Sequence, residues 1–355
     1  MNLRRGLFIF MLLSLGVSFL VVRQSLTPEA LHVIFDLDWS IAAWIVPAIL
    51  AAWCCDAGRF LMVSKAMGYR ISFWRGLTLT WLNYFGSAIT PLQVGGGPFQ
   101  VYVLYAQDKI PVGSGMAITM LRTLMSTFML SLLAPSALWL APELLARYGL
   151  ARGIYFYVCC LSVVLWCIVL SSVFRPRWIQ KVVGFFALRL KRFHRLRKLP
   201  VLSIYRRVGR EMMNYSHNLR QAFHPGRRRY CFLAFLLSCG YLFCIFSVLP
   251  IMVRALGLSV PFDQAVSAQA MLMFTLYFIP TPGGSGVAEG GAAALFGMLV
   301  PHSLAGVMAV AWRFFTEHVA ILIGGVVALR LIGLGRAGQL IAGEETNLEK
   351  KVQDE

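Results

Sequence analysis

The sequence predicts an all-α polytopic membrane protein with an inverted repeat, about six full transmembrane crossings and two broken re-entrant hairpins. Long apolar runs carry the first part of this prediction. Of the 355 residues, 58% are hydrophobic and 14% are charged, whereas a soluble domain has about a quarter charged. The distribution of Lys and Arg and two matching Pro/Gly-rich passages carry the rest.

Six apolar runs are long enough to cross a bilayer as helices, which takes roughly 20 mostly apolar residues. They are residues 6–22, 39–67, 113–140, 152–174, 230–256 and 303–331. The first run resembles a signal peptide because it follows a basic start. No small-x-small cleavage site follows it, so we expect a transmembrane helix there.

Two further stretches, 74–108 and 262–300, are apolar but broken by Pro and Gly. No water satisfies freed backbone groups in the bilayer core, so such breaks occur only where they are enclosed by protein or line a watered cavity. We therefore expect each stretch to be a re-entrant hairpin that enters and leaves on one side of the membrane.

Basic residues predict the orientation, because cytoplasmic loops are rich in Lys and Arg. Arg4 and Arg5 place the N-terminus in the cytoplasm. Sixteen of the 33 Lys and Arg residues lie between Arg175 and Arg229, where Glu211 is the one acid. We expect this loop to lie against the anionic cytoplasmic leaflet of a bacterial inner membrane. Nucleic acid is not an expected partner, because no recognised nucleic-acid module accompanies the charge.

These elements divide the chain into two membrane repeats and a tail, with both termini cytoplasmic. The predicted divisions are repeat 1 over 1–140 with hairpin 74–108, repeat 2 over 141–334 with basic loop 175–229 and hairpin 262–300, and a polar cytoplasmic tail over 335–355. Each repeat has an odd number of crossings, so the second copy is expected to lie upside down relative to the first.

Two passages match each other. One reads TPLQVGGGPFQVYVLY from Thr90, and the other reads IPTPGGSGVAEGGAAALF from Ile279. Aligning Pro91 with Pro280 places Gly97 on Gly286 and Gln100 on Glu289, and after a small insertion Arg122 pairs with Arg313. Inverted repeats with paired broken helices are typical of secondary transporters. The alternative is that Gly/Pro clusters, which are common in membrane helices, imitate symmetry.

Charged residues inside the apolar runs are candidates for a site, because a central charge costs about 2.5–3.5 kcal/mol on insertion scales. Asp56 and Arg59 share a helix face at i, i+3, so we expect a structural ion pair. Arg122, Arg313 and Glu289 also lie in apolar runs. Either they pair with one another, with Glu317 or with freed carbonyl groups to hold broken helices, or they bind a substrate.

The Gly-rich breaks suit an anion, because unpaired N–H groups and the positive dipole end of a half-helix attract phosphate. Glycine also allows a ligand to approach the backbone closely. Tight helix packing by small residues is the alternative, and it is our expectation for Gly290 and Gly291. The glycines concerned in the breaks are Gly95, Gly96, Gly97, Gly283, Gly284 and Gly286.

The PTPGGSGVAE motif at 280–289, the earlier Pro91 and GGG element with Asn83 before it, and the Arg on each following helix resemble one known family. This is the lysylphosphatidylglycerol synthase transmembrane-region family, and the resemblance covers nearly the whole chain. It implies a domain that flips aminoacylated phosphatidylglycerol between leaflets. Two features depart from it: no soluble aminoacyl-transferase domain is recognisable, and Gln100 stands where the family commonly has Arg.

We therefore expect a stand-alone, flippase-like transporter of a phospholipid or lipid-linked amphiphile, with no cofactor and no metal. Arg122 and Arg313 would hold phosphate, and Glu289 would pair with one of them or carry a coupling proton. The alternatives are a membrane enzyme, or a subunit of a complex, that modifies lipid headgroups or lipid-linked glycans. No nucleophile–base set supports the enzyme. The expected site comprises Asn83, Pro91, Gly96, Gly97, Gln100, Arg122, Pro282, Gly283, Gly284, Gly286, Glu289 and Arg313. Membrane lipids are the expected partners, and a lipid-synthesis enzyme is a candidate partner.

Overall fold

A computed structural model describes residues 35–90, 93, 95–140, 149–174 and 224–332, together with isolated positions between 16 and 23. Within these ranges all regular structure is helical, and no strand is present. Most of the expected first crossing, Pro91, most of the basic loop and the tail 335–355 lie outside the described residues.

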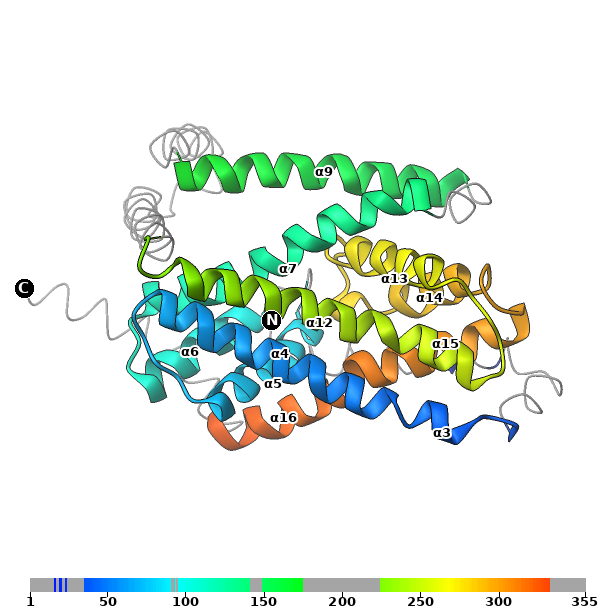
Figure 1. Cartoon of the computed structure of the whole chain (residues 1–355), viewed down its shortest axis with the longest axis horizontal. Coiled ribbons are helices and arrows are strands. Elements are labelled where there is room, and N and C mark those ends of the chain that lie inside the picture. The colour runs from blue at the N-terminus through cyan, green and yellow to red at the C-terminus, as the bar shows by residue number, and fades with distance from the viewer. Residues whose placement is uncertain are drawn as a thin grey trace, which may run out of the picture.

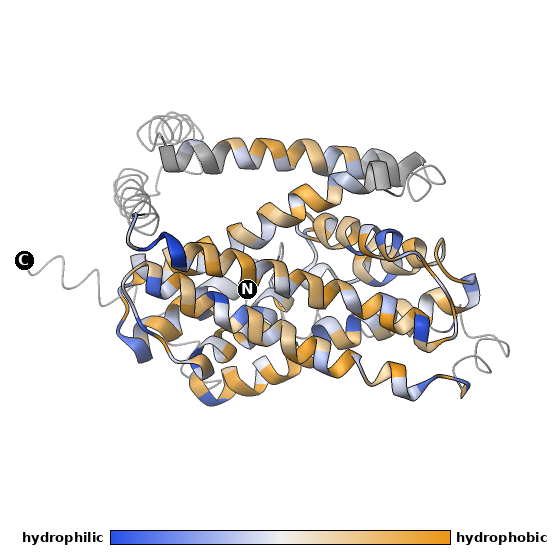
Figure 2. Cartoon of the chain, in the orientation of Figure 1, coloured by the Kyte–Doolittle hydropathy of each residue, from blue (hydrophilic) through white to orange (hydrophobic). Residues whose placement is uncertain are grey.

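The described helices follow the predicted order. They are α3 (Trp39–Ala42), α4 (Ile45–Ala66), α5 (Phe73–Ala88), α6 (Gly96–Asp108), α7 (Val112–Leu140), α9 (Gly149–Phe174), α12 (Arg228–Ala255), α13 (Phe262–Leu276), the 3-10 turn η3 (Pro282–Gly284), α14 (Val287–Phe296), α15 (His302–Arg313), the π turn η4 (Phe314–His318) and α16 (Val319–Ile332). Figure 2 shows apolar residues along the middle of the long helices and hydrophilic residues at their ends.

Four stretches of the described residues are helical, long and apolar enough to cross a membrane. They are Trp39–Ala66, Val112–Ser136, Arg228–Ala255 and His302–Leu331. They coincide with four of the six expected crossings, and α9 lies over a fifth. The all-α part of the prediction is therefore confirmed for the described chain.

The helices α4 and α12 run antiparallel across the bundle (Figure 1). At one end the Arg227 side chain donates a hydrogen bond to the carbonyl oxygen of Ala66 at 3.3 Å. At the other end the Asp38 backbone N–H donates to the carbonyl oxygen of Ala255 at 2.9 Å. The arginine lies at the last turn of α4, where the negative end of the helix dipole favours a cation.

Each Pro/Gly-rich stretch is two helices joined by a break, and neither is one continuous helix. The first hairpin, α5 and α6, opens at the end of the bundle where Arg227 contacts Ala66. Its start and finish are paired there, since Arg75 lies 2.9 Å from Asp108. Tyr69, after α4, and Ser114, at the start of α7, share a hydroxyl hydrogen bond of 3.1 Å at this end. The second hairpin, α13 and α14, lies in the opposite half of the bundle (Figure 1).

Packing between the two halves of the chain is reciprocal. Helix α4 packs on α12, α5 packs on α16, and α7 packs on α13. Within each half, α5 contacts α6 as α13 contacts α14, and α6 contacts α7 as α14 contacts α15. Exchanging α4 with α12, α5 with α13, α6 with α14 and α7 with α15–α16 maps these contacts onto themselves.

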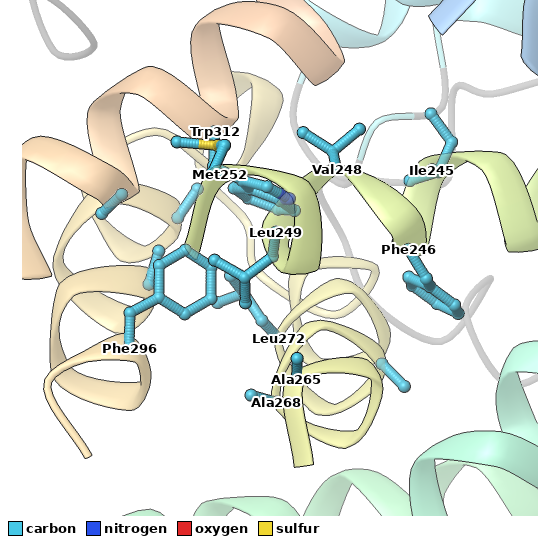
Figure 3. Close-up of a cluster of buried hydrophobic side chains, with 14 of the residues drawn as sticks. Ile245, Phe246, Val248, Leu249, Met252, Ala265, Ala268, Leu272, Phe296 and Trp312 are labelled. Atoms are coloured by element: carbon cyan, nitrogen blue, oxygen red, sulfur yellow. The ribbon is translucent and has the colours of Figure 1, made fainter. Parts of the chain in front are cut away.

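The apolar core of the second half lies between α12, α13, α14 and α15 (Figure 3). Phe296 and Trp312 meet edge to face, with ring centroids 5.7 Å apart, a geometry that aromatic pairs prefer. Leu249, Met252 and Leu272 fill the space around them. This packing fixes the end of α15, which carries Arg313, relative to the second hairpin.

Gly324→Ala is expected to destabilise the fold because α16 lies against the backbone of α5 at this point. An added Cβ would lie 2.8 Å from the carbonyl carbon of Trp81 and 2.9 Å from the Cβ of Phe85. Overpacking of this kind costs about 1–3 kcal/mol. Thermal unfolding in detergent measures the loss.

Gly325→Ala is the matched control, because its Cβ would lie 3.4 Å from the Phe85 ring. We expect the Gly325 variant to unfold within a few degrees of the wild type. Equal losses for the two neighbouring positions would contradict the close α5–α16 contact.

Candidate functional site

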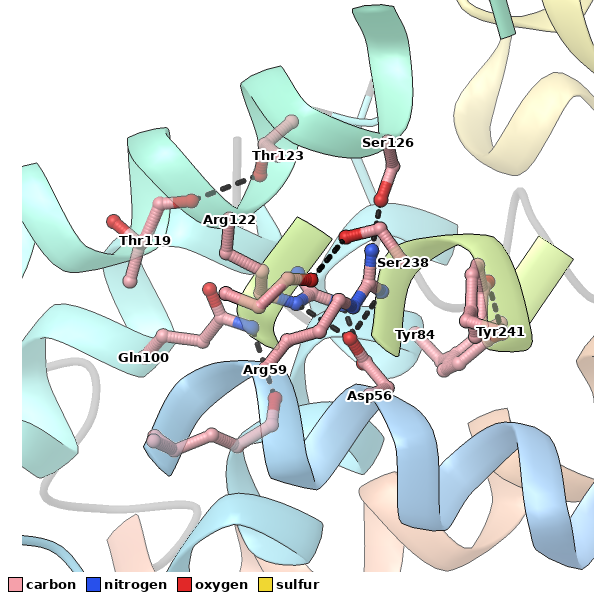
Figure 4. A network of polar contacts seen from close by, with 12 residues as sticks. Asp56, Arg59, Tyr84, Gln100, Thr119, Arg122, Thr123, Ser126, Ser238 and Tyr241 are labelled. Atoms are coloured by element: carbon pink, nitrogen blue, oxygen red, sulfur yellow. Dashed lines mark hydrogen bonds and ion pairs between the residues drawn. The ribbon is translucent and has the colours of Figure 1, made fainter. Parts of the chain in front are cut away.

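A buried cluster of three charges connects α4 with α7 (Figure 4). The Asp56 carboxylate accepts a hydrogen bond from Arg122 Nε at 2.7 Å and a second from its Nη2. Arg59 Nη2 donates to the same carboxylate. All three side chains are buried, so two guanidinium groups share one carboxylate and leave one positive charge. We call these residues the Asp56 cluster.

Polar and aromatic groups surround Arg59. It donates to Ser126 on α7, and its guanidinium carbon lies 4.4 Å from the centroid of the Tyr241 ring. A cation over an aromatic face is stabilised by the ring quadrupole. The Tyr241 hydroxyl shares a 2.9 Å hydrogen bond with Tyr84 of α5. The Asp56 cluster is thereby tied to α12 and to the first hairpin.

A second buried cluster has the opposite stoichiometry. Arg313 lies between two carboxylates, with its Nη1 2.6 Å from Glu289 Oε2 and its Nε 3.2 Å from Glu317 Oε2. Its Nη2 donates to the carbonyl oxygen of Gly283 at 2.6 Å. Here two carboxylates face one guanidinium group. We call Glu289, Arg313 and Glu317 the Arg313 cluster.

The second break owes its shape to glycine. Gly283, Gly284 and Gly286 have φ values of 59°, 67° and 87°, a region that is costly for residues with a Cβ. The backbone N–H of Gly286 donates to Glu289 at 2.7 Å, which caps the first turn of α14. The Arg313 guanidinium therefore contacts both the break, at Gly283, and the carboxylate that caps the half-helix.

A π turn follows Arg313 directly. Residues Phe314–His318 form η4 between α15 and α16, whereas the sequence predicts one uninterrupted crossing over 303–331. Such π-bulges are rare in proteins, and those that occur are frequently at functional sites. This one contains Glu317, so the irregular turn and the second carboxylate of the Arg313 cluster coincide.

Gln269 is a buried polar residue that sequence reasoning missed. Pro250 inside α12 has no N–H, so the carbonyl oxygen of Phe246 has no helical donor. Gln269 Nε2 donates to this oxygen at 2.8 Å, and Trp312 Nε1 donates to Gln269 Oε1 at 2.8 Å. Gln269 could have been predicted from the sequence, because a proline inside one membrane helix is followed by a side-chain amide in the next helix.

The first break is held together by its own hydrogen bonds. The Thr90 hydroxyl donates to the carbonyl oxygen of Gly86 at 2.9 Å and accepts from the N–H of Gly95 at 2.8 Å. The Ser87 hydroxyl donates to the carbonyl oxygen of Gln93 at 3.0 Å. These bonds satisfy part of the backbone that the break frees.

The predicted residues of the first hairpin differ in their surroundings. Gly96 lies against α5, because an added Cβ would be 2.8 Å from the carbonyl oxygen of Asn83. Gln100 is buried and donates to the carbonyl oxygen of Leu79 at 2.9 Å. Gly97, one residue into α6, has open space, with no heavy atom within 4 Å of an added Cβ.

The two breaks meet each other. The Gln93 side-chain nitrogen lies 3.5 Å from the position of a Cβ on Gly284, and α5 contacts the turn Pro282–Gly284. Tyr84 of α5, which shares a hydrogen bond with Tyr241, interacts electrostatically with both Asp56 and Glu317.

The structure thus joins Gly283, Gly286, Glu289 and Arg313 in one cluster, and places Arg122 in the other with Asp56 and Arg59. Asn83, Gly96 and Gln100 pack within the first hairpin, and Pro282 begins the turn of the second break. Among the described residues no three His, Cys, Asp or Glu side chains form a metal site.

Comparison with known proteins shows which family the chain belongs to. The model of the family described as "Lysylphosphatidylglycerol synthase TM region" matches residues 7–324. A "UPF0104 membrane protein" of Archaeoglobus fulgidus is 26% identical over 300 residues, which are 82% of this chain and 89% of that protein. The family match covers most of the chain and confirms the resemblance seen in the sequence. The protein is a membrane protein that belongs to the lysylphosphatidylglycerol synthase TM region family.

Proposed function

We propose that this protein is a flippase-like transporter that moves a phospholipid or lipid-linked amphiphile between the leaflets of the cytoplasmic membrane. The observation that carries the proposal is the meeting of two broken hairpins from opposite halves of the bundle, each beside a buried ion cluster. Secondary transporters bind substrate where paired broken helices meet. Membrane lipids are then the partners, and a lipid-synthesis enzyme is a candidate supplier of the substrate.

The reciprocal packing supports an inverted repeat. Contacts that map onto themselves, together with the odd number of crossings expected in each half, are what a pseudo-twofold axis in the membrane plane would produce. Lys65, Arg75 and Arg227 lie at the end where the first hairpin opens, so we place this end in the cytoplasm, with both termini. Labelling of a cysteine introduced into 175–229 from the opposite side would overturn this orientation.

The headgroup phosphate is proposed to bind where the breaks meet. Arg122 and Arg313 attract it, and the backbone N–H groups of the Gly-rich breaks donate to it. In the structure both guanidinium groups hold carboxylates. A phosphate therefore binds these guanidinium groups by replacing a carboxylate oxygen. This replacement links lipid binding to rearrangement of the hairpins.

The test is reconstitution of the purified chain into phosphatidylcholine–phosphatidylglycerol vesicles that contain a phosphatidylglycerol analogue with a fluorescent acyl chain. Bleaching of the outer leaflet by dithionite reports how fast analogue from the inner leaflet appears outside. The proposal expects faster exchange than in protein-free vesicles and no new lipid on chromatography. A new lipid product would favour an enzyme instead, and exchange no faster than in protein-free vesicles would overturn the proposal.

Gly97→Leu is expected to slow translocation at least several-fold while leaving thermal unfolding unchanged. The added side chain enters open space next to the first break, so it meets the substrate rather than the protein. Gly290→Leu is the matched control, because it also has open space and is exposed on α14. Equal rates for the wild type and the Gly97 variant would remove Gly97 from the site.

A further inference from the structure

The Arg313 cluster has one carboxylate more than it has cations. Arg313 is the guanidinium group between Glu289 and Glu317, and it is fully buried. Two carboxylates that share a buried site do not both ionise readily, since like charges repel and desolvation disfavours each. In other proteins such pairs hold one proton between them.

Geometry distinguishes the two carboxylates. Glu289 is 0% exposed, has its Oε2 2.6 Å from Arg313 Nη1 and accepts the Gly286 N–H at 2.7 Å, so it is the more closely held of the two carboxylates. Glu317 has a contact of 3.2 Å to Arg313 Nε, and its side chain is 17% exposed. The longer bond and the partial exposure favour Glu317 as the neutral, exchangeable member.

Among the described residues, the ion pair that Glu317 makes is with Arg313, and other charged or titratable groups lie on the neighbouring elements. Helix α15 contributes Arg313 itself, and η4 contributes the imidazole of His318. Helix α5 contributes the phenol of Tyr84. From α4, Asp56 and Arg59 are bonded within the Asp56 cluster. In α16 the basic residue is Arg330, in the last turn.

We infer that Glu317 carries one exchangeable proton and that its loss and gain couple lipid translocation to a proton gradient. This inference rests on the proposed function. On release the Glu317 O–H bond breaks and the proton passes to water on one side. The new carboxylate then draws the guanidinium from the Gly283 carbonyl, which frees the second break. Reprotonation from the other side restores the contact.

The first experiment is infrared difference spectroscopy of the purified full chain in maltoside detergent, titrated with alkali from neutral pH. The wild type is expected to show a protonated carboxyl band that disappears as pH rises. The band should be absent from Glu317→Gln and unchanged in Asp263→Asn, an exposed carboxylate at the start of α13. If the wild type lacks the band, or if the band persists in Glu317→Gln, the claim that Glu317 carries an exchangeable proton is wrong.

The second experiment decides which carboxylate holds it. Glutamine is isosteric with a neutral glutamic acid, so Glu317→Gln should unfold at the same temperature as the wild type at neutral pH. Glu289→Gln removes an ionised acceptor and should unfold at a lower temperature. If Glu317→Gln unfolds at the lower temperature, or if both variants lose the same amount of stability, the proton does not lie on Glu317 and the assignment is wrong.

The third experiment measures translocation in vesicles with and without an imposed pH gradient. The wild-type rate should change with pH by up to about tenfold per unit, the limit for one proton, and Glu317→Gln should show no dependence. Wild-type translocation that ignores the gradient overturns the coupling. A wild type that moves no lipid overturns the proposed function and the coupling together, while the infrared band still decides the proton.

Discussion

Asp56→Asn is expected to remove most of the folded protein, because one change leaves two buried guanidinium groups without their carboxylate. Arg59 and Arg122 both bond to Asp56, and all three are buried. Removing one partner of a buried ion pair costs about 3–5 kcal/mol, which is a large part of a typical net stability. Fluorescence-detected gel filtration and thermal unfolding measure the loss.

Folded yield should recover stepwise as the number of unpaired guanidinium groups falls. Adding Arg59→Gln or Arg122→Gln to Asp56→Asn leaves one unpaired guanidinium, so each double variant recovers part of the folded yield. The triple variant leaves none and recovers more, since a buried charged network replaced as a whole is often tolerated. The three sites touch one another, and their effects are therefore expected to be non-additive.

The partly exposed pair at the opening of the first hairpin supplies the control. Arg75 and Asp108 are 23% and 17% exposed, against 7% or less for the side chains of the Asp56 cluster, so solvent screens this pair more and we expect its loss to cost less. Asp108→Asn should therefore leave folded yield close to that of the wild type. Strictly additive losses in the Asp56 series would mean that these three charges do not act as one cluster.

The fold was predictable where local sequence sets it. Long apolar runs determine the helices α4, α7, α12 and α15–α16, and the glycines of 283–286 determine the second break, because φ values of 59° to 87° are costly for other residues. The π turn at Phe314–His318 was not predictable. No local pattern specifies one extra residue in a helical turn.

The site was only partly predictable, because long-range partners decide it. Arg122 and Arg313 align in the sequence, yet one bonds to Asp56 on α4 and the other to Glu289 on α14. The i, i+3 spacing places Asp56 and Arg59 on one face, but Arg122, which is 66 residues from Asp56, was not evident from spacing.

Arg313→Ala is expected to have the largest effect on translocation. It leaves Glu289 and Glu317 without their guanidinium and removes the donor to the carbonyl oxygen of Gly283. We expect unfolding at a lower temperature, with a loss of about 3–5 kcal/mol as for any broken buried ion pair, and lipid movement close to the protein-free rate. Arg313→Lys should restore part of both, because a lysine is a point charge without the planar fork that bonds three acceptors at once.

Lost translocation in Arg313→Ala has two explanations, and a charge-balanced variant separates them. Combining Arg313→Gln with Glu289→Gln and Glu317→Gln removes the arginine without leaving a buried charge, and the amide oxygen that Glu289→Gln introduces can still accept the Gly286 N–H. This triple variant should unfold near the wild-type temperature. Its translocation, measured without a pH gradient and divided by the amount of folded protein, is expected to stay at least about tenfold below wild type. That corresponds to the loss of one charge-assisted contact of about 1.5–3 kcal/mol. If the triple variant moves lipid at the wild-type rate, Arg313 has only a structural role, and the phosphate attraction proposed for it is wrong.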